Sequence, residues 1–115
     1  MFMGDSVEVT AEKIRRIEIQ GARNVAIAAI KAFQTLAEQT KASNKKDLLK
    51  ELREAQGLFA SARDTEPLMR NAMRYIINQT QTAPTEQVAA LRQVVNETAD
   101  GFLNTPEVVD AFTTL

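Results

Sequence analysis

The sequence predicts an all-α fold, a single bundle of five or six short helices. Apolar residues recur at spacings of three and four along most of the chain, which is the periodicity of one helix face. Alternating runs of β-branched residues, which would indicate strands, are absent from the sequence. The chain has 115 residues, of which 44% are apolar and 25% charged, as in an ordinary globular domain. We therefore expect residues 1–115 to form one helical domain.

The first predicted helix begins after Asp5 or Ser6, either of which can act as an N-cap. Gly21 ends the segment, because glycine suits a helix end or a tight turn between helices. The apolar stripe of this helix consists of Val7, Ala11, Ile14 and Ile17.

The second predicted helix runs from about Ala22 to Thr40 and is apolar almost all round, with many alanines. A helix of this kind belongs in the middle of a bundle, where neighbours approach closely on several sides. Residues 41–44 then supply an N-cap for a third helix, and Asp47 stands three residues further on as a capping-box partner.

The third predicted helix carries one apolar face and one charged face. Gly57 lies inside it and costs about 1 kcal/mol relative to alanine, so we expect a neighbour to pack closely there. Residues 61–65 are interpreted as a connector. The apolar face consists of Leu48, Leu52, Ala55 and Phe59.

A fourth helix is predicted after Thr65, its N-cap, with Pro67 in the first turn. Its methionines are interpreted as core residues, and Tyr75 is expected to pack its ring while its hydroxyl faces water. Residues 78–84 are interpreted as a polar linker. The apolar face consists of Leu68, Met69, Ala72, Met73, Ile76 and Ile77.

Two further helices are predicted at the C-terminal end. Thr85 caps the fifth helix, and Thr105 opens a short last helix with Pro106 at its first position. The apolar stripe of the fifth helix consists of Val88, Leu91, Val95, Ala99 and Phe102, and that of the last consists of Val108 and Phe112.

The amino-acid composition excludes several kinds of catalytic and binding site. The sequence contains no cysteine and no histidine, so thiolate and imidazole chemistry is excluded and we expect no metal or cofactor. Fourteen basic and 15 acidic residues give a net charge of -1 without a long run of one sign, which disfavours direct nucleic-acid binding. No run approaches the roughly 18 apolar residues of a membrane span. Without a secretory signal, we expect a cytoplasmic protein without membrane partners.

Two segments carry more than helix periodicity. They are residues 9–22, VTAEKIRRIEIQGA, and residues 62–75, ARDTEPLMRNAMRY. In this order and spacing they resemble the N-terminal helical domain of the translation initiation factor 2B alpha/beta/delta family. That family also contains ribose-1,5-bisphosphate isomerase and methylthioribose-1-phosphate isomerase. The resemblance covers nearly all of the chain, from about Val7 to Phe112.

The resemblance implies a phosphate site. The isomerases carry Arg-Gly-Ala in the first segment and Thr-Arg-Pro-Thr in the second, and these arginines and backbone amides face the sugar's phosphates. Amides at a helix start and guanidinium groups are suitable phosphate ligands. The phosphate-binding candidates in this sequence are Gly21, Ala22, Arg23, Arg63 and Thr65, whereas no residue of this chain is expected to be catalytic.

The sequence departs from the isomerase pattern at two positions. Gln20 stands in place of the first arginine, which removes a positive charge and a bidentate donor. Asp64 stands in place of the proline and adds a negative charge beside the expected phosphate. The run from Gln20 to Arg23, Gln-Gly-Ala-Arg, is similar to what the alpha subunit of the eukaryotic factor carries.

The resemblance leaves more than one function open. Our first interpretation is a regulatory domain like those of initiation factor 2B subunits, contacting the alpha subunit of initiation factor 2 or sister subunits. The alternative is the substrate-capping domain of a ribose-1,5-bisphosphate isomerase-type enzyme, with a sugar phosphate or nucleotide as ligand of the full-length protein. A third interpretation is a small helical adaptor that offers a groove to a partner helix.

Each family interpretation implies a longer protein. In the family a C-terminal Rossmann-like domain follows the helical domain and carries the catalytic cysteine and aspartate of the isomerases. We therefore expect the chain to be a fragment that lacks this domain, not an enzyme on its own, and to come from a homo-oligomeric parent.

Overall fold

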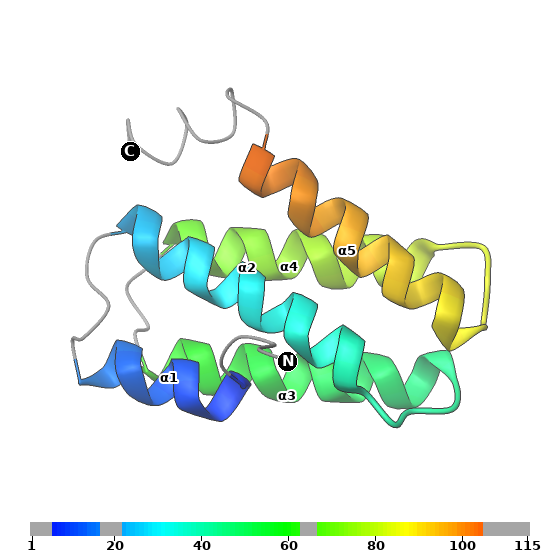
Figure 1. Cartoon of the computed structure of the whole chain (residues 1–115), viewed down its shortest axis with the longest axis horizontal. Coiled ribbons are helices and arrows are strands. Elements are labelled where there is room, and N and C mark those ends of the chain that lie inside the picture. Colours follow the sequence, from blue (N-terminus) through cyan, green and yellow to red (C-terminus); the bar gives the residue numbers. More distant parts are fainter. Residues whose placement is uncertain (1–5, 17–21, 63–66, 105–115) are drawn as a thin grey trace.

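The computed structural model describes residues 6–16, 22–62 and 67–104, which form five helices and no strand (Figure 1). The predicted all-α class is therefore confirmed. The short helix expected from Thr105 lies outside the described residues, as do the stripe residue Ile17 and the cap Thr65. The helices are α1 (Val7–Arg15), α2 (Ala22–Gln39), α3 (Lys45–Ala62), α4 (Pro67–Thr82) and α5 (Val88–Asn104).

Helix α2 occupies the centre of the bundle. It contacts each of the other four helices, with α1 and α3 on one side and α4 and α5 on the other (Figure 1). Three of its alanines, Ala26, Ala29 and Ala37, are fully buried. Small side chains on several faces let the neighbouring helices approach, so the predicted central position of this segment is confirmed.

The core draws on all five helices. Phe33 of α2 and Phe59 of α3 are fully buried, and their ring centroids lie 6.3 Å apart in a tilted arrangement. Met69 and Met73 are buried in α4, as the sequence indicates. The ring of Tyr75 packs edge-on against Phe102 at 5.4 Å, although the residue remains 49% exposed.

Two helix starts follow the predicted capping residues, whereas the cap predicted at Thr85 is wrong, because α5 begins three residues later at Val88. The Thr85 hydroxyl oxygen accepts from the Gln87 amide at 3.2 Å, ahead of the helix. Ser6 caps α1, because its hydroxyl oxygen accepts a hydrogen bond from the Val9 amide at 3.2 Å. Asn44 caps α3: its side-chain oxygen accepts from the Asp47 amide at 2.8 Å. The Asn44 side-chain amide in turn donates to the Asp47 carboxylate at 3.2 Å. These bonds satisfy amides that the first helical turn leaves without an intrahelical partner.

Two segments predicted to be irregular are helical. The connector predicted at residues 61–65 is wrong at its start, because α3 continues through Ala62. The linker predicted at 78–84 is also wrong, because α4 continues to Thr82. Thr80 and Thr82 donate their hydroxyls to the carbonyl oxygens four residues back, at 2.8 and 2.9 Å. These polar side chains are satisfied within the helix and do not interrupt it.

The prediction that a neighbour packs against Gly57 is wrong. This glycine is exposed in α3, and a β-carbon placed there would meet no atom within 4 Å. Gly57 lies two residues from both Ala55 and Phe59, which face the core, so the helix periodicity turns Gly57 to the outer side. Its helical position therefore has no packing reason in the described part of the chain.

No helix in the described residues is both long and apolar enough to cross a membrane.

Candidate anion site at one end of the bundle

The order and direction of the helices bring the two motif segments to one end of the bundle. Helices α1 and α3 end there, at Arg15 and Ala62, and α2 and α4 begin there, at Ala22 and Pro67 (Figure 1). We call this the motif end. The connections between α2 and α3 and between α4 and α5 lie at the opposite end, which we call the tied end. Segments about forty residues apart in sequence are thus joined to neighbouring helix termini.

The structure describes only part of the expected phosphate-binding set. Ala22 is the first residue of α2, and Arg23 follows it with an exposed side chain. The other expected residues lie outside the described ranges, as do the two departures from the isomerase pattern, so their roles stay predictions. These residues are Gly21, Arg63 and Thr65, together with Gln20 and Asp64.

Basic side chains predominate in the described part of the motif end. Arg15 is the last residue of α1, Arg16 is its C-cap, and Arg23 is the second residue of α2. Arg15 and Arg16 share the carboxylate of Glu12, at 2.7 Å and 2.8 Å respectively. These ion pairs link residues three and four positions apart on an exposed helix surface, where such pairs are weak.

Arg70 is a further cation that the sequence interpretation did not select. It lies one turn after Pro67 in α4 and is exposed. Neither Arg23 nor Arg70 makes a hydrogen bond or ion pair within the described chain. The signal was present in the second segment, where Arg70 follows the expected helix start by one turn. It went unused because the isomerase motif that carried the resemblance stops before this position.

The backbone at the motif end supplies hydrogen-bond donors, but the helix dipoles that meet there oppose one another. The first turns of α2 and α4 carry amide groups without intrahelical acceptors, which favour an anion. The last turns of α1 and α3 bring carbonyl groups of the opposite polarity to the same end. Because these partial charges oppose one another, the arginines decide the sign of the potential, and in the described residues that sign is positive.

The described residues contain no group of three or more acidic side chains arranged to hold a metal ion. The guanidinium groups and helix-start amides in this part of the motif end are suited to binding an anion.

Comparison with known proteins identifies the group to which these segments belong. The profile of the initiation factor 2 subunit family matches residues 18–112. The chain belongs to the initiation factor 2 subunit family. The resemblance inferred from the two motif segments is thereby confirmed. The matched range includes the whole second segment and residues 18–22 of the first.

Several proteins similar to this chain are named ribose 1,5-bisphosphate isomerase. The protein of Pyrococcus furiosus is 34% identical over 99 residues, which cover 84% of this chain and 31% of the relative. That of Thermococcus kodakarensis is 33% identical over 99 residues, with the same coverage. That of Methanocaldococcus jannaschii is 32% identical over 101 residues, covering 87% of this chain and 30% of the relative. The chain thus spans about a third of the length of these relatives.

Proposed function

We propose that this chain is the N-terminal helical part of a sugar-phosphate isomerase of the ribose-1,5-bisphosphate type. The single observation that carries the proposal is the 32–34% identity, over most of the chain, to several archaeal proteins with that name. This favours the alternative of our two family interpretations over the regulatory one. The proposed role is to bind a phosphate group of the sugar at the motif end and to cover the substrate.

The proposed phosphate contacts come from both motif segments. Arg23 and the amides at the start of α2 would act from the first segment, and Arg63 and Thr65 from the second. A guanidinium group binds phosphate oxygens through two parallel hydrogen bonds, and helix-start amides add directed donors. The position of both helix starts at one end of the bundle supports the proposal, because a single anion could then meet donors from both.

The two departures from the isomerase pattern weaken this site and shape what it would bind. Gln20 keeps a hydrogen-bond donor but lacks the charge of arginine. Asp64 would repel a phosphate unless Arg63 neutralises it. We propose that Arg23 and Arg70 supply the missing positive charge, since both are exposed and without a partner in the described ranges.

The chemical step would lie outside this chain. The sequence has no cysteine or histidine, and in the isomerases the resemblance assigns catalysis to the C-terminal domain. The proposed contribution of the helical part is to orient the substrate and exclude water, both of which lower the barrier for proton transfer.

The assay of the natural gene product tests the proposal directly. The protein is purified from its own cells, its intact mass is measured, and it is incubated with ribose 1,5-bisphosphate. We expect a mass near three times that of this chain, since the chain covers 31% of its relatives, and conversion of the aldose to the ketose. A folded product of that size without turnover at saturating substrate would overturn the proposal, as would a gene product of this chain's own mass.

One observation favours a second candidate, the regulatory interaction with initiation factor 2. The run Gln20-Gly21-Ala22-Arg23 is similar to what the alpha subunit of the eukaryotic factor carries, and it differs from the Arg-Gly-Ala motif of the isomerases at Gln20. A pull-down of the natural gene product with the alpha subunit of initiation factor 2 tests it. Recovery of the factor at micromolar protein, together with absent turnover, would exchange the order of the two candidates.

A further inference from the structure

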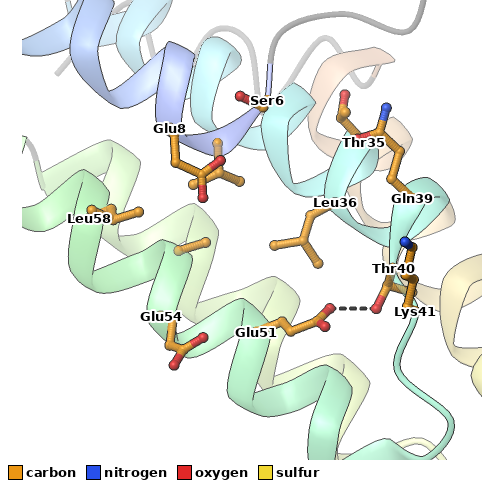
Figure 2. A pocket seen from close by; sticks show the side chains of 12 residues that line it. Ser6, Glu8, Thr35, Leu36, Gln39, Thr40, Lys41, Glu51, Glu54 and Leu58 are labelled. Atoms are coloured by element: carbon orange, nitrogen blue, oxygen red, sulfur yellow. Dashed lines mark hydrogen bonds between the residues drawn. The ribbon is translucent and has the colours of Figure 1, made fainter.

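A groove opens where α1 begins, because α1 is too short to fill its row in the bundle. Helices α2 and α3 each have 18 residues, whereas α1 has nine. At about 1.5 Å per residue, α1 is about 13 Å shorter than either neighbour. The space beyond its N-terminus is a groove of about 360 Å³ between the C-terminal half of α2 and α3 (Figure 2). We call it the acidic groove.

The floor of the acidic groove is apolar. Leu36 of α2 and Leu58 of α3 point into the space between the helices (Figure 2). Leu36 is partly buried, and Leu58 is 36% exposed, which places it among the most exposed large apolar side chains in the described ranges. Val7 and Ala55 complete the apolar lining and belong to the core beneath it.

The rim is negatively charged. Glu8 of α1 projects over the groove, and Glu51 and Glu54 line it from α3, whereas Lys41 is the basic residue among the lining side chains (Figure 2). Three carboxylates and one ammonium group give a net charge of about -2. Glu51 accepts a hydrogen bond from the Thr40 hydroxyl. Glu8 and Glu54 have no hydrogen bond or ion pair within the part of the chain that the structure describes.

We propose that the acidic groove binds a basic amphipathic helix of a partner protein. The apolar side chains of that helix would cover Leu36 and Leu58, as an amphipathic helix does in a hydrophobic groove. Its lysines or arginines would meet Glu8, Glu51 and Glu54. Such a helix would lie against α2 and α3, the same two helices that α1 contacts.

Charge complementarity selects the basic partner over others. An apolar or acidic segment lying on the floor would bring the Glu8 and Glu54 carboxylates against a surface that offers them no counter-charge. Unpaired desolvated charge opposes binding, and like charge opposes it further. A lysine or arginine instead forms charge-assisted hydrogen bonds with these carboxylates and speeds the encounter.

The acidic groove is separate from the motif end. Helix α1 starts at the groove with Val7 and ends at the motif end with Arg15. The two surfaces also differ in sign, since the motif end is basic in its described part. A helix in the groove and a sugar phosphate at the motif end would therefore contact different residues, so that variants at one surface test one proposal without removing contacts of the other.

A peptide titration tests the proposal. The probe is a fluorescein-labelled 14-residue peptide with leucine on one helical face and lysine on the flanks. Binding is followed by fluorescence anisotropy near physiological salt. We expect saturable binding to the chain, weakened about tenfold by Glu54→Lys, which turns an attraction into a repulsion. Leu58→Ala should weaken it about fivefold through the loss of apolar contact area.

Glu97→Lys is the matched control, because Glu97 is an exposed carboxylate on α5 and the change in net charge is the same. We expect less than a twofold effect from it. Glu54 and Leu58 are both exposed, and thermal melting checks that each variant folds. If Glu54→Lys melts at a lower temperature than the unmodified chain, Glu54→Gln replaces it, and we expect Glu54→Gln to weaken peptide binding about threefold.

Several outcomes would overturn the proposal. They are absence of binding, equal effects of Glu54→Lys and Glu97→Lys, or no effect of Leu58→Ala. Binding that appears only after removal of residues 1–5 would make the chain's own terminus the occupant. Concentration-dependent dimerisation that Glu54→Lys abolishes would make a second copy the occupant.

Discussion

The two ends of the bundle use their basic residues in different ways. At the tied end, the Lys45 ammonium group donates to the carbonyl oxygens of Gln81 at 3.0 Å and Ala83 at 2.8 Å. Arg92 donates to the Thr40 carbonyl oxygen at 3.3 Å. The Lys45 bonds join the start of α3 to the end of α4, and the Arg92 bond joins α5 to the end of α2, across long sequence separations.

At the motif end, the described arginines hold nothing together over such distances. Arg15 and Arg16 bond within one helix turn, to Glu12. Arg23 and Arg70 are exposed and have no partner in the described ranges. A cation that bonds backbone carbonyls is committed to the fold, whereas an exposed cation without a partner is available to an anion. The comparison therefore separates an end whose cations bond the backbone of the bundle from an end at which we propose that a ligand binds.

The largest expected effect is the loss of stability when the tied end loses Lys45. Lys45→Met removes two charge-assisted hydrogen bonds and leaves the carbonyl groups of Gln81 and Ala83 without this donor. We expect the free energy of unfolding to fall by about 2 kcal/mol, measured by urea denaturation. Arg23→Met is the matched variant at the motif end and should change it by less than about 0.5 kcal/mol. Equal losses would remove the distinction between the ends.

The cap of α3 is the next contribution at the tied end. Asn44→Ala removes the side-chain oxygen that accepts from the Asp47 amide. We expect a loss of about 1 kcal/mol in the free energy of unfolding by the same urea titration. Asn44→Ser keeps an acceptor oxygen without placing a second carboxylate beside Asp47, and it serves as the control. If Asn44→Ser destabilises as much as Asn44→Ala does, the loss does not come from the cap.

A smaller change, an increase in the free energy of unfolding, is expected at Gly57, which takes no part in the bonds of Lys45 or in the cap of α3. Gly57→Ala places a methyl group in open space on α3 and lowers the entropy of the unfolded chain. The free energy of unfolding should rise by about 0.5–1 kcal/mol, seen as a higher urea midpoint at an unchanged slope. A destabilised Gly57→Ala protein would show that this position is covered after all.

The smallest effect is expected for the other long-range cation of the tied end. Arg92 makes one hydrogen bond of 3.3 Å, and its Nε atom is buried without a partner in the structure's described part. In Arg92→Met the lost bond and the relieved desolvation of Nε should nearly cancel, leaving a change within about 0.5 kcal/mol. A loss as large as that of Lys45→Met would show that Arg92 holds the tied end equally.

The sequence was sufficient for the fold class, the helix faces and the caps at Ser6 and Asn44, because these depend on local periodicity and local hydrogen bonds. It was misleading for α4 beyond Ile77. There a run of polar residues resembles a linker, but buried Thr80 satisfies its own hydroxyl and Lys45 binds the end of the helix from 36 residues away. A bond of that kind is tertiary and has no local signal.

The candidate site was less predictable than the fold. The resemblance located the motif end through two short segments, but topology was needed to bring their helix termini together. Arg70 was missed because its importance follows from where α4 starts in the bundle. The acidic groove had no sequence signal, since it arises from the difference in length between α1 and its neighbours.

The most direct measurement of the central claim is a titration of the isotope-labelled chain with ribose 1,5-bisphosphate, followed by amide chemical shifts. We expect shifts confined to the motif end, in the first turns of α2 and α4, with the tied end unchanged. Arg23→Gln should weaken binding about tenfold, the equivalent of one charge-assisted hydrogen bond, and Arg74→Gln on the exposed middle of α4 should leave it unchanged. Shifts spread over both ends, or none at about 10 mM ligand, would contradict the assignment of the motif end as the ligand-binding end.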